Sequence, residues 1–222
     1  MDMERIISTV AQSAPGFLLA IVFHEWAHGY AAKIFGDDTA ERSGRLTFNP
    51  AAHIDMMGTI IFPLIGVMIG GMAFGWAKPV PVNARNFRDI RKATFWVSFA
   101  GPLANLILGI VSAFLYVLLI KRIPEFAIKG SLSQILYFSI YINFILMGFN
   151  LIPLPPLDGS KMVASFLKGE ALRTYEGIAQ YTQYIFIGAI MLSFAGVHIF
   201  GYLLMPFMAI GQFAMGIFNF IL

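Results

Sequence analysis

Apolar residues are gathered into long runs, which polar connections separate along the chain. The runs cover residues 14–32, 54–76, 95–120, 132–152 and 177–222, and the last contains glycines near 196–201 that predict a turn between two helices. A helix of about 19 residues measures about 28 Å, close to the thickness of a bilayer's hydrocarbon core. The pattern predicts an all-α polytopic membrane protein with about five to six transmembrane helices.

The composition leads to the same class of protein. The 222 residues are 58% hydrophobic and 12% charged, whereas charged residues make up about 25% of ordinary soluble domains. We expect one membrane-embedded domain at 1–222, with a core at 14–161 and a C-terminal helical hairpin at 177–222. The basic residues lie in short loops rather than on one face, so we expect a lipid bilayer and no nucleic acid as partner. The chain has no cysteine, so any metal must be bound by histidine and carboxylate side chains.

His24, Glu25 and His28 form the motif H-E-x-x-H within the first apolar run. Residues four apart on an α-helix share a face, so both imidazoles can reach one Zn2+, while Glu25 is available as general base to activate a metal-bound water. The alternative is a hydrogen-bonded histidine pair at a helix interface, which would leave ionisable groups in lipid without a metal or water. The motif therefore indicates a zinc site, with one Zn2+ per chain.

A catalytic zinc ion usually has three protein ligands and one open position, so the two histidines need a further partner. Asp158 is the best candidate, because it lies beside the helix break P-P-L-D-G at 155–159 and ionisable groups at membrane helix ends tend to face a cavity or a metal. The alternative roles for Asp158 are a helix cap or an ion-pair partner of Lys161. The other acidic residues are predicted to be solvated surface: Asp2, Glu4, Asp37, Asp38, Glu41, Asp55, Asp89, Glu125, Glu170 and Glu176.

The positions of His28 and Asp158 restrict the topology. If residues 54–76, 95–120 and 132–152 each crossed the membrane, the two side chains would lie on opposite faces, which zinc bonds near 2 Å forbid. Either the site lies near the midplane, or residues 54–76, which glycines and Pro63 interrupt, form a re-entrant Gly/Pro-rich loop or a short β-hairpin near the site. Re-entry is favoured. The basic cluster at 83–92 is then cytoplasmic and the N-terminus lies outside.

Three motifs together resemble a known family. H-E-W-A-H at 24–28, G-P-L-A-N at 101–105 and N-L-I-P-L-P-P-L-D-G at 150–159 occur in the order typical of the site-2 protease family, the intramembrane zinc metalloproteases of peptidase family M50. The sequence G-W-A-K-P-V-P-V-N at 75–83 looks like that of bacterial members. The resemblance implies zinc ligands His24, His28 and Asp158 and the general base Glu25. It also implies that Asn105 and Asn150 orient the substrate or polarise its carbonyl.

Residues 78–82 alternate proline with other residues and cannot be helical, because each proline pushes its predecessor toward extended geometry. One hypothesis is that Lys78, Val80 and Val82 line the site and pair with an unwound substrate as an added strand. The alternative is an ordinary tight turn at the surface.

These features predict an intramembrane zinc metalloendopeptidase of the HExxH type, which hydrolyses peptide bonds in or next to transmembrane segments during regulated intramembrane proteolysis. The alternative is a non-proteolytic metal-binding membrane protein or an ion carrier, which would not need Glu25 beside the ligands. The expected partners are a transmembrane protein substrate and the lipid bilayer. Whether the chain forms a homo-oligomer stays an open question. The expected location is a bacterial or archaeal cell membrane, crossed several times.

Overall fold

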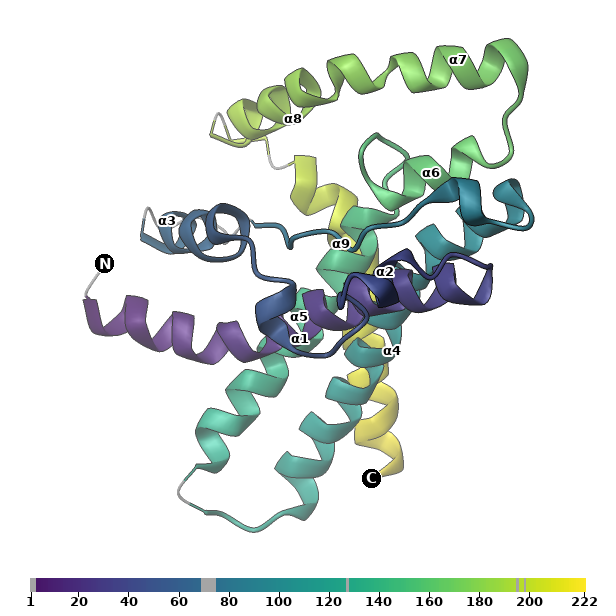
Figure 1. Cartoon of the computed structure of the whole chain (residues 1–222). Coiled ribbons are helices and arrows are strands. Elements are labelled where there is room, and N and C mark those ends of the chain that lie inside the picture. Colours follow the sequence, from purple (N-terminus) through teal and green to yellow (C-terminus); the bar gives the residue numbers. More distant parts are fainter. Residues whose placement is uncertain (1–2, 69–74, 127, 195, 198) are drawn as a thin grey trace.

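The computed structural model describes residues 3–68, 75–126, 128–194, 196–197 and 199–222, and within these ranges the chain forms helices and loops without strands (Figure 1). Four of the described helices are long and apolar enough to cross a membrane. They are α1 (Met3–Ile34), α4 (Ile90–Arg122), α5 (Lys129–Asn150) and α9 (Ile199–Ile221). The predicted all-α polytopic class is confirmed, with four such helices rather than five to six.

The C-terminal run accounts for part of this difference. It contains α8 (Ala179–Phe194), which forms a long rod with the preceding α7 (Gly169–Gly177) across the top of Figure 1, before α9 descends through the molecule. The 16 residues of α8 are fewer than the about 20 that a transmembrane helix needs. Gly196, at φ 89°, lies in the connection from α8 to α9 and adopts a backbone conformation that favours glycine.

The apolar run at 54–76 does not cross from one side to the other. It begins with the π-helical turn η2 (Met56–Ile61) and α3 (Phe62–Met68), and residues 69–74 lie outside the described part. Its two ends are joined, because the Trp76 N–H donates to the Gly58 carbonyl at 3.0 Å and the Thr59 hydroxyl donates to the Trp76 carbonyl at 2.9 Å. A single crossing would separate these ends by about 30 Å. Entry of this returning loop into the bilayer stays a prediction.

The core of the bundle lies where α4, α5 and α9 meet. Phe144 of α5 is fully buried there, between Gly109 of α4 and Gly211 of α9. A Cβ atom added to Gly109 would lie 3.0 Å from the Phe144 ring, and one added to Gly211 would lie 2.8 Å from it. Glycine at both positions therefore lets the helices approach closely, as is common in membrane bundles.

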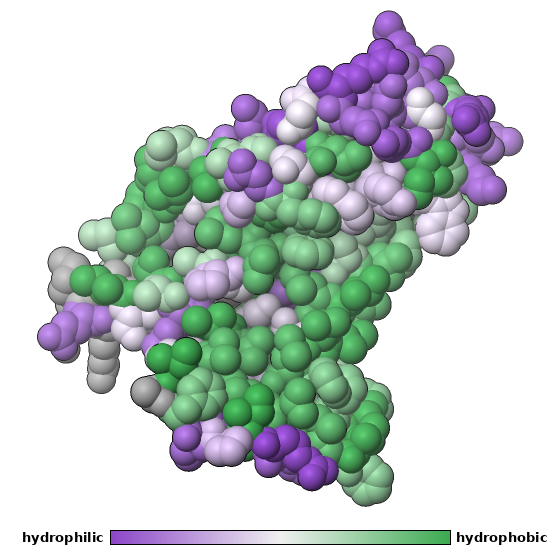
Figure 2. All heavy atoms as spheres, turned by 60° about the horizontal axis from the view of Figure 1, so that its bottom comes forward, coloured by the Kyte–Doolittle hydropathy of each residue, from purple (hydrophilic) through white to green (hydrophobic). Residues whose placement is uncertain are grey.

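This arrangement puts both parts of the predicted site at one end of the bundle. Because the run at 54–76 returns to its start, only α4 and α5 separate α1 from α6 (Asp158–Ala164), and one leads away while the other leads back (Figure 1). The short elements α2 (Thr39–Arg42), η1 (Pro50–Ala52) and η3 (Ala84–Asn86) lie in the connections at this end. Figure 2 shows hydrophobic residues over most of the face in view, with hydrophilic residues gathered toward its ends.

Candidate metal centre

His24 and His28 lie one above the other on α1, as the four-residue spacing predicts. Their rings meet edge to face with centroids 4.6 Å apart, and their Nε2 atoms are 3.0 Å apart. Both side chains are largely excluded from solvent, at 9% and 12% exposure. The two nitrogens are therefore placed to bind the same ion.

Asp158 completes the cluster from a different part of the chain. It is the first residue of α6, directly after Pro155, Pro156 and Leu157, and one of its carboxylate oxygens lies 3.2 Å from Nε2 of each histidine. The nitrogen and oxygen atoms of this cluster all lie within 4.8 Å of one another. The structure thus brings together the three residues that the sequence analysis proposed as ligands.

The cluster suits a divalent metal ion in its chemistry as well as its geometry. Oδ2 of Asp158 is buried and has no hydrogen-bond donor among the described residues, and leaving a buried carboxylate oxygen without a partner is costly. Two imidazole nitrogens and one carboxylate oxygen are a common catalytic ligand set for Zn2+, with a fourth position left for water or substrate. The residues present fit a zinc ion. The Lys161 ammonium, 3.8 Å from the other Asp158 oxygen, is an exposed and longer contact.

Hydrogen bonds on the far side of each imidazole fix which nitrogen faces the cluster. His24 donates from Nδ1 to Asn105 Oδ1 at 2.6 Å, and His28 donates from Nδ1 to the Val97 carbonyl at 2.6 Å. A nitrogen that donates to an oxygen carries the proton, so Nε2 of each ring keeps its lone pair for the metal. Both partners come from α4, which therefore sets the orientation of the two rings.

Asn105 is itself held by a buried polar network. Its Nδ2 donates to the Ala20 carbonyl at 3.1 Å and to Asn143 Oδ1 at 3.0 Å, and Asn143 in turn donates to the Ser139 carbonyl at 2.8 Å. Asn105 and Asn143 are fully buried. Because both ends of the Asn105 amide have partners within the protein, the structure gives it the position of a support for His24.

Gly101 of α4 lies against the edges of the two imidazole rings that carry Nε2 and Cε1. A Cβ atom at this position would lie 2.5 Å from His28 Nε2 and 2.6 Å from His24 Cε1. Real Cβ contacts of this length essentially do not occur, so the glycine of the G-P-L-A-N motif is needed for the rings to lie where they do.

Glu25 does not face Asp158 as His24 and His28 do, but contacts the segment at 78–83. Its Oε2 accepts a hydrogen bond of 2.7 Å from the Val80 N–H, and its side chain is half-buried. The structure therefore brings Val80, of the proline-rich segment, to the residue predicted as general base. Val80 is buried at 8% exposure, whereas Val82 is 40% exposed and Lys78 is also exposed.

The remaining predicted residues are not brought into the ligand cluster. Asn150 is half-buried and donates from Nδ2 to the Leu146 carbonyl at 3.0 Å. Lys78 and Val82 belong to the segment that passes Glu25, but no contact joins their side chains to the three ligands among the described residues. The substrate-binding roles of Asn105, Asn150, Lys78, Val80 and Val82 stay predictions.

Sequence reasoning missed two polar residues that the structure buries. Asn143 was not singled out, although an amide inside a long apolar helix is a usable signal, because such a group needs a partner in lipid. Asp37 was predicted to be solvated surface, and this is wrong, since the structure leaves it 0% exposed. Its burial depends on contacts with residues far along the chain, which no local pattern reveals.

The fold and the site together define a helical membrane protein with a histidine and carboxylate metal cluster. The model of peptidase family M50 matches residues 119–193, which include Asp158 and Asn150 but not the histidine pair. Over this part of its length the chain is similar to peptidase family M50, the family that its motifs resemble.

Three relatives carry names of the same kind. YwhC of Bacillus subtilis (strain 168), named as a candidate zinc metalloprotease, is 45% identical over 66% of this chain and 64% of its own length. Rip2 of Mycolicibacterium smegmatis, named likewise, is 29% identical over 75% of this chain and 61% of its own length. Zinc metalloprotease MJ0392 of Methanocaldococcus jannaschii is 27% identical over 67% of this chain and 32% of its own length. The chain thus spans less than two thirds of each of these relatives, and no solved structure matches it.

Proposed function

We propose that this chain is a zinc metalloendopeptidase that cleaves peptide bonds in or next to transmembrane segments of membrane proteins. The observation that carries the proposal is the convergence of His24 Nε2, His28 Nε2 and Asp158 Oδ2, an oxygen without a hydrogen-bond donor among the described residues. Glu25 lies between the two histidines on α1. The match to the model of family M50 and the names of the relatives support it. The four apolar helices of the bundle that carries the cluster support a substrate taken from the membrane.

The three ligand residues would hold one Zn2+, with His24 and His28 oriented by α4. When bound, zinc polarises a peptide carbonyl and makes a water molecule more acidic. The Glu25 carboxylate would accept a proton from the attacking water and deliver it to the nitrogen of the leaving amine. The Val80 N–H, bonded to Oε2, would keep that carboxylate in one orientation during both transfers.

A transmembrane helix has to unwind before its peptide carbonyls can react, because its backbone groups are paired with one another. The segment at 78–83 would receive the unwound strand. The Val80 carbonyl and the Val82 N–H have no hydrogen-bond partner among the described residues, so they are free to pair with an added chain. We propose a transmembrane protein as substrate and the cell membrane of a bacterium or archaeon as the location.

The experiment that tests the proposal measures zinc content and cleavage of a model transmembrane substrate in detergent. The native chain should bind one equivalent of zinc and cleave. Glu25→Gln should keep its zinc and lose cleavage, because it removes the base and no ligand. Asp158→Ala should lose most of its zinc. Zinc-loaded native protein that leaves a varied set of transmembrane substrates intact would instead favour a non-proteolytic metal-binding protein.

A further inference from the structure

Asp37 lies at a fixed position immediately after α1. The helix ends at Ile34, and the chain then turns through Gly36, which has φ 107°. The Gly36 N–H donates to the Lys33 carbonyl at 3.1 Å and the Asp37 N–H donates to the Ala32 carbonyl at 2.9 Å. This is the hydrogen-bond pattern of a Schellman motif, with glycine in the left-handed conformation. The backbone of Asp37 is therefore anchored to the helix that carries the histidine pair.

The buried Asp37 carboxylate holds the far end of the segment at 78–83. Its Oδ2 accepts from the Asn83 N–H at 2.6 Å, and its Oδ1 accepts from Asn86 Nδ2 at 2.7 Å and from the Thr39 hydroxyl at 2.5 Å. Hydrogen bonds to an ionised acceptor are roughly twice as strong as neutral ones. The charged side chain thus joins the end of α1 to the end of the segment.

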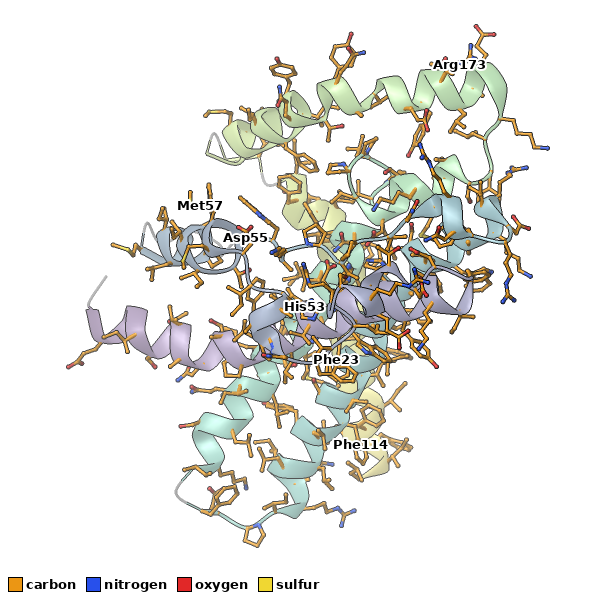
Figure 3. All side chains as sticks on the ribbon, in the orientation of Figure 1. Phe23, His53, Asp55, Met57, Phe114 and Arg173 are labelled. Carbon is orange, nitrogen blue, oxygen red and sulfur yellow. The ribbon has the colours of Figure 1, made fainter. Side chains whose placement is uncertain are left out.

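Arg45 and the backbone of His53 hold the near end of the same segment. Arg45 donates from Nη2 to the Lys78 carbonyl at 2.7 Å and to the Pro79 carbonyl at 3.2 Å. The Lys78 N–H donates to the carbonyl of His53, a fully buried residue that Figure 3 shows near the centre of the molecule, beside α1. Between these two anchors lies Val80, whose N–H bonds to Glu25.

We propose that Asp37 and Arg45 are positioning residues that hold the segment at 78–83 against α1 so that the Val80 N–H fixes the Glu25 carboxylate beside the metal ligands. The segment has no secondary structure of its own and two prolines without N–H groups. Its place against α1 therefore depends on hydrogen bonds from outside it. The inference rests on the proposed function, because it assigns Glu25 the role of general base.

The test compares Asp37→Asn, Arg45→Met and the double variant with the native chain, measuring kcat and KM per bound zinc on a model transmembrane substrate. Each single variant should lower kcat about tenfold, the value of one hydrogen bond to a charged group, with zinc content little changed. KM should rise as well, because the same segment would receive the substrate strand. The double variant should lose little more than either single variant, because both changes release the same Val80 N–H. If the two changes only destabilised the fold at separate sites, the fall in unfolding temperature of the double variant would instead equal the sum of the falls in the two single variants.

Asp38 and Arg42 offer a matched control. They form an ion pair with each other at 2.7 Å, with side chains 39% and 78% exposed, and touch neither end of the segment. Asp38→Asn and Arg42→Met repeat the two chemical changes next to Asp37 and Arg45, and they should leave kcat per bound zinc unchanged. A loss of kcat in these controls equal to that in the anchor variants would overturn the inference.

Hydrogen exchange gives a readout that does not depend on activity. Val80 lies between Pro79 and Pro81, which have no N–H, so its amide can be followed separately from its neighbours. Its exchange should be slow in the native chain and about tenfold faster or more in Asp37→Asn and Arg45→Met. Unchanged exchange, unchanged kcat per bound zinc, or a rise in kcat that marks the segment as an inhibitory latch, would each overturn the inference. Anchor-dependent protection in a zinc-loaded chain that cleaves nothing would count against the proposed function alone.

Discussion

Replacing Gly101 by alanine should remove zinc from the protein without unfolding it. The new Cβ atom would lie 2.5 Å from His28 Nε2, so the ring or α4 has to move by about 0.9 Å to reach the 3.4 Å of ordinary van der Waals contact. Zinc sites tolerate about 0.2 Å in their bond lengths. Both imidazoles are affected, because the same atom would lie 2.6 Å from His24 Cε1. We therefore expect zinc affinity to fall by about 100-fold or more, with cleavage lost in proportion.

The effect on stability should be small. Alanine in a helix interior is favoured over glycine by about 1 kcal/mol, which offsets part of the about 1–3 kcal/mol that the close contact costs, so the metal-free Gly101→Ala protein should unfold within a few degrees of the metal-free native chain. Zinc affinity is measured by competition with a chelator, and unfolding by a thermal scan in detergent. Gly216→Ala in α9 is the matched control, since nothing lies within 4 Å of a Cβ atom added there. Native zinc affinity in Gly101→Ala would refute the packing of α4 against the two rings.

Three further predictions follow from other parts of the molecule. Asn105→Ala removes the acceptor of the His24 Nδ1–H and should lower zinc affinity by about 10-fold to 100-fold, measured by the same competition, and a native affinity would show that Asn105 does not support the ring. Phe144→Ala leaves a cavity between Gly109 and Gly211 and should lower the free energy of unfolding by about 3–5 kcal/mol, whereas an unchanged unfolding transition in detergent would contradict the packing described for the core. Burial alone would raise the pKa of Asp37, but the hydrogen bonds from Thr39, Asn83 and Asn86 outweigh it and hold that pKa below its ordinary 3.8. The native chain should therefore keep this stabilisation above about pH 4 and lose it as the pH falls through the lowered pKa, while Asp37→Asn should lack that acid-dependent loss in a pH series of unfolding temperatures.

The sequence was sufficient where the geometry is local. His24, Glu25 and His28 could be placed from their spacing, because one α-helix fixes their relation. Asp158 required more, namely the ligand number of zinc and its place beside the helix break at 155–159. The role of α4 in orienting the rings could not be derived, since the hydrogen bonds of Asn105 and Val97 and the close approach of Gly101 join residues that only the tertiary fold brings together.

The connections show where sequence reasoning stops. The apolar run at 54–76 has the length of a span, and re-entry is favoured because His28 and Asp158 have to meet at one zinc ion. The pairing of Trp76 with Gly58 and Thr59 that returns the run is not visible in its hydropathy. Asp37 resembles the exposed Asp38 in sequence, but only Asp37 meets the backbone of Asn83. The burial of an acidic residue in a loop therefore cannot be predicted from the local sequence when a distant segment supplies its hydrogen-bond donors.

The meeting of His28 and Asp158 also affects how distant parts of the chain are linked. His28 and Asp158 lie on either side of the α4–α5 hairpin in sequence and face each other at 3.2 Å in space. In a chain without cysteine, a zinc ion held by these residues would act as the molecule's cross-link, closing a long loop as a disulfide does in a secreted protein. Removal of zinc would then break the link between α1 and α6 while the helices themselves stay folded.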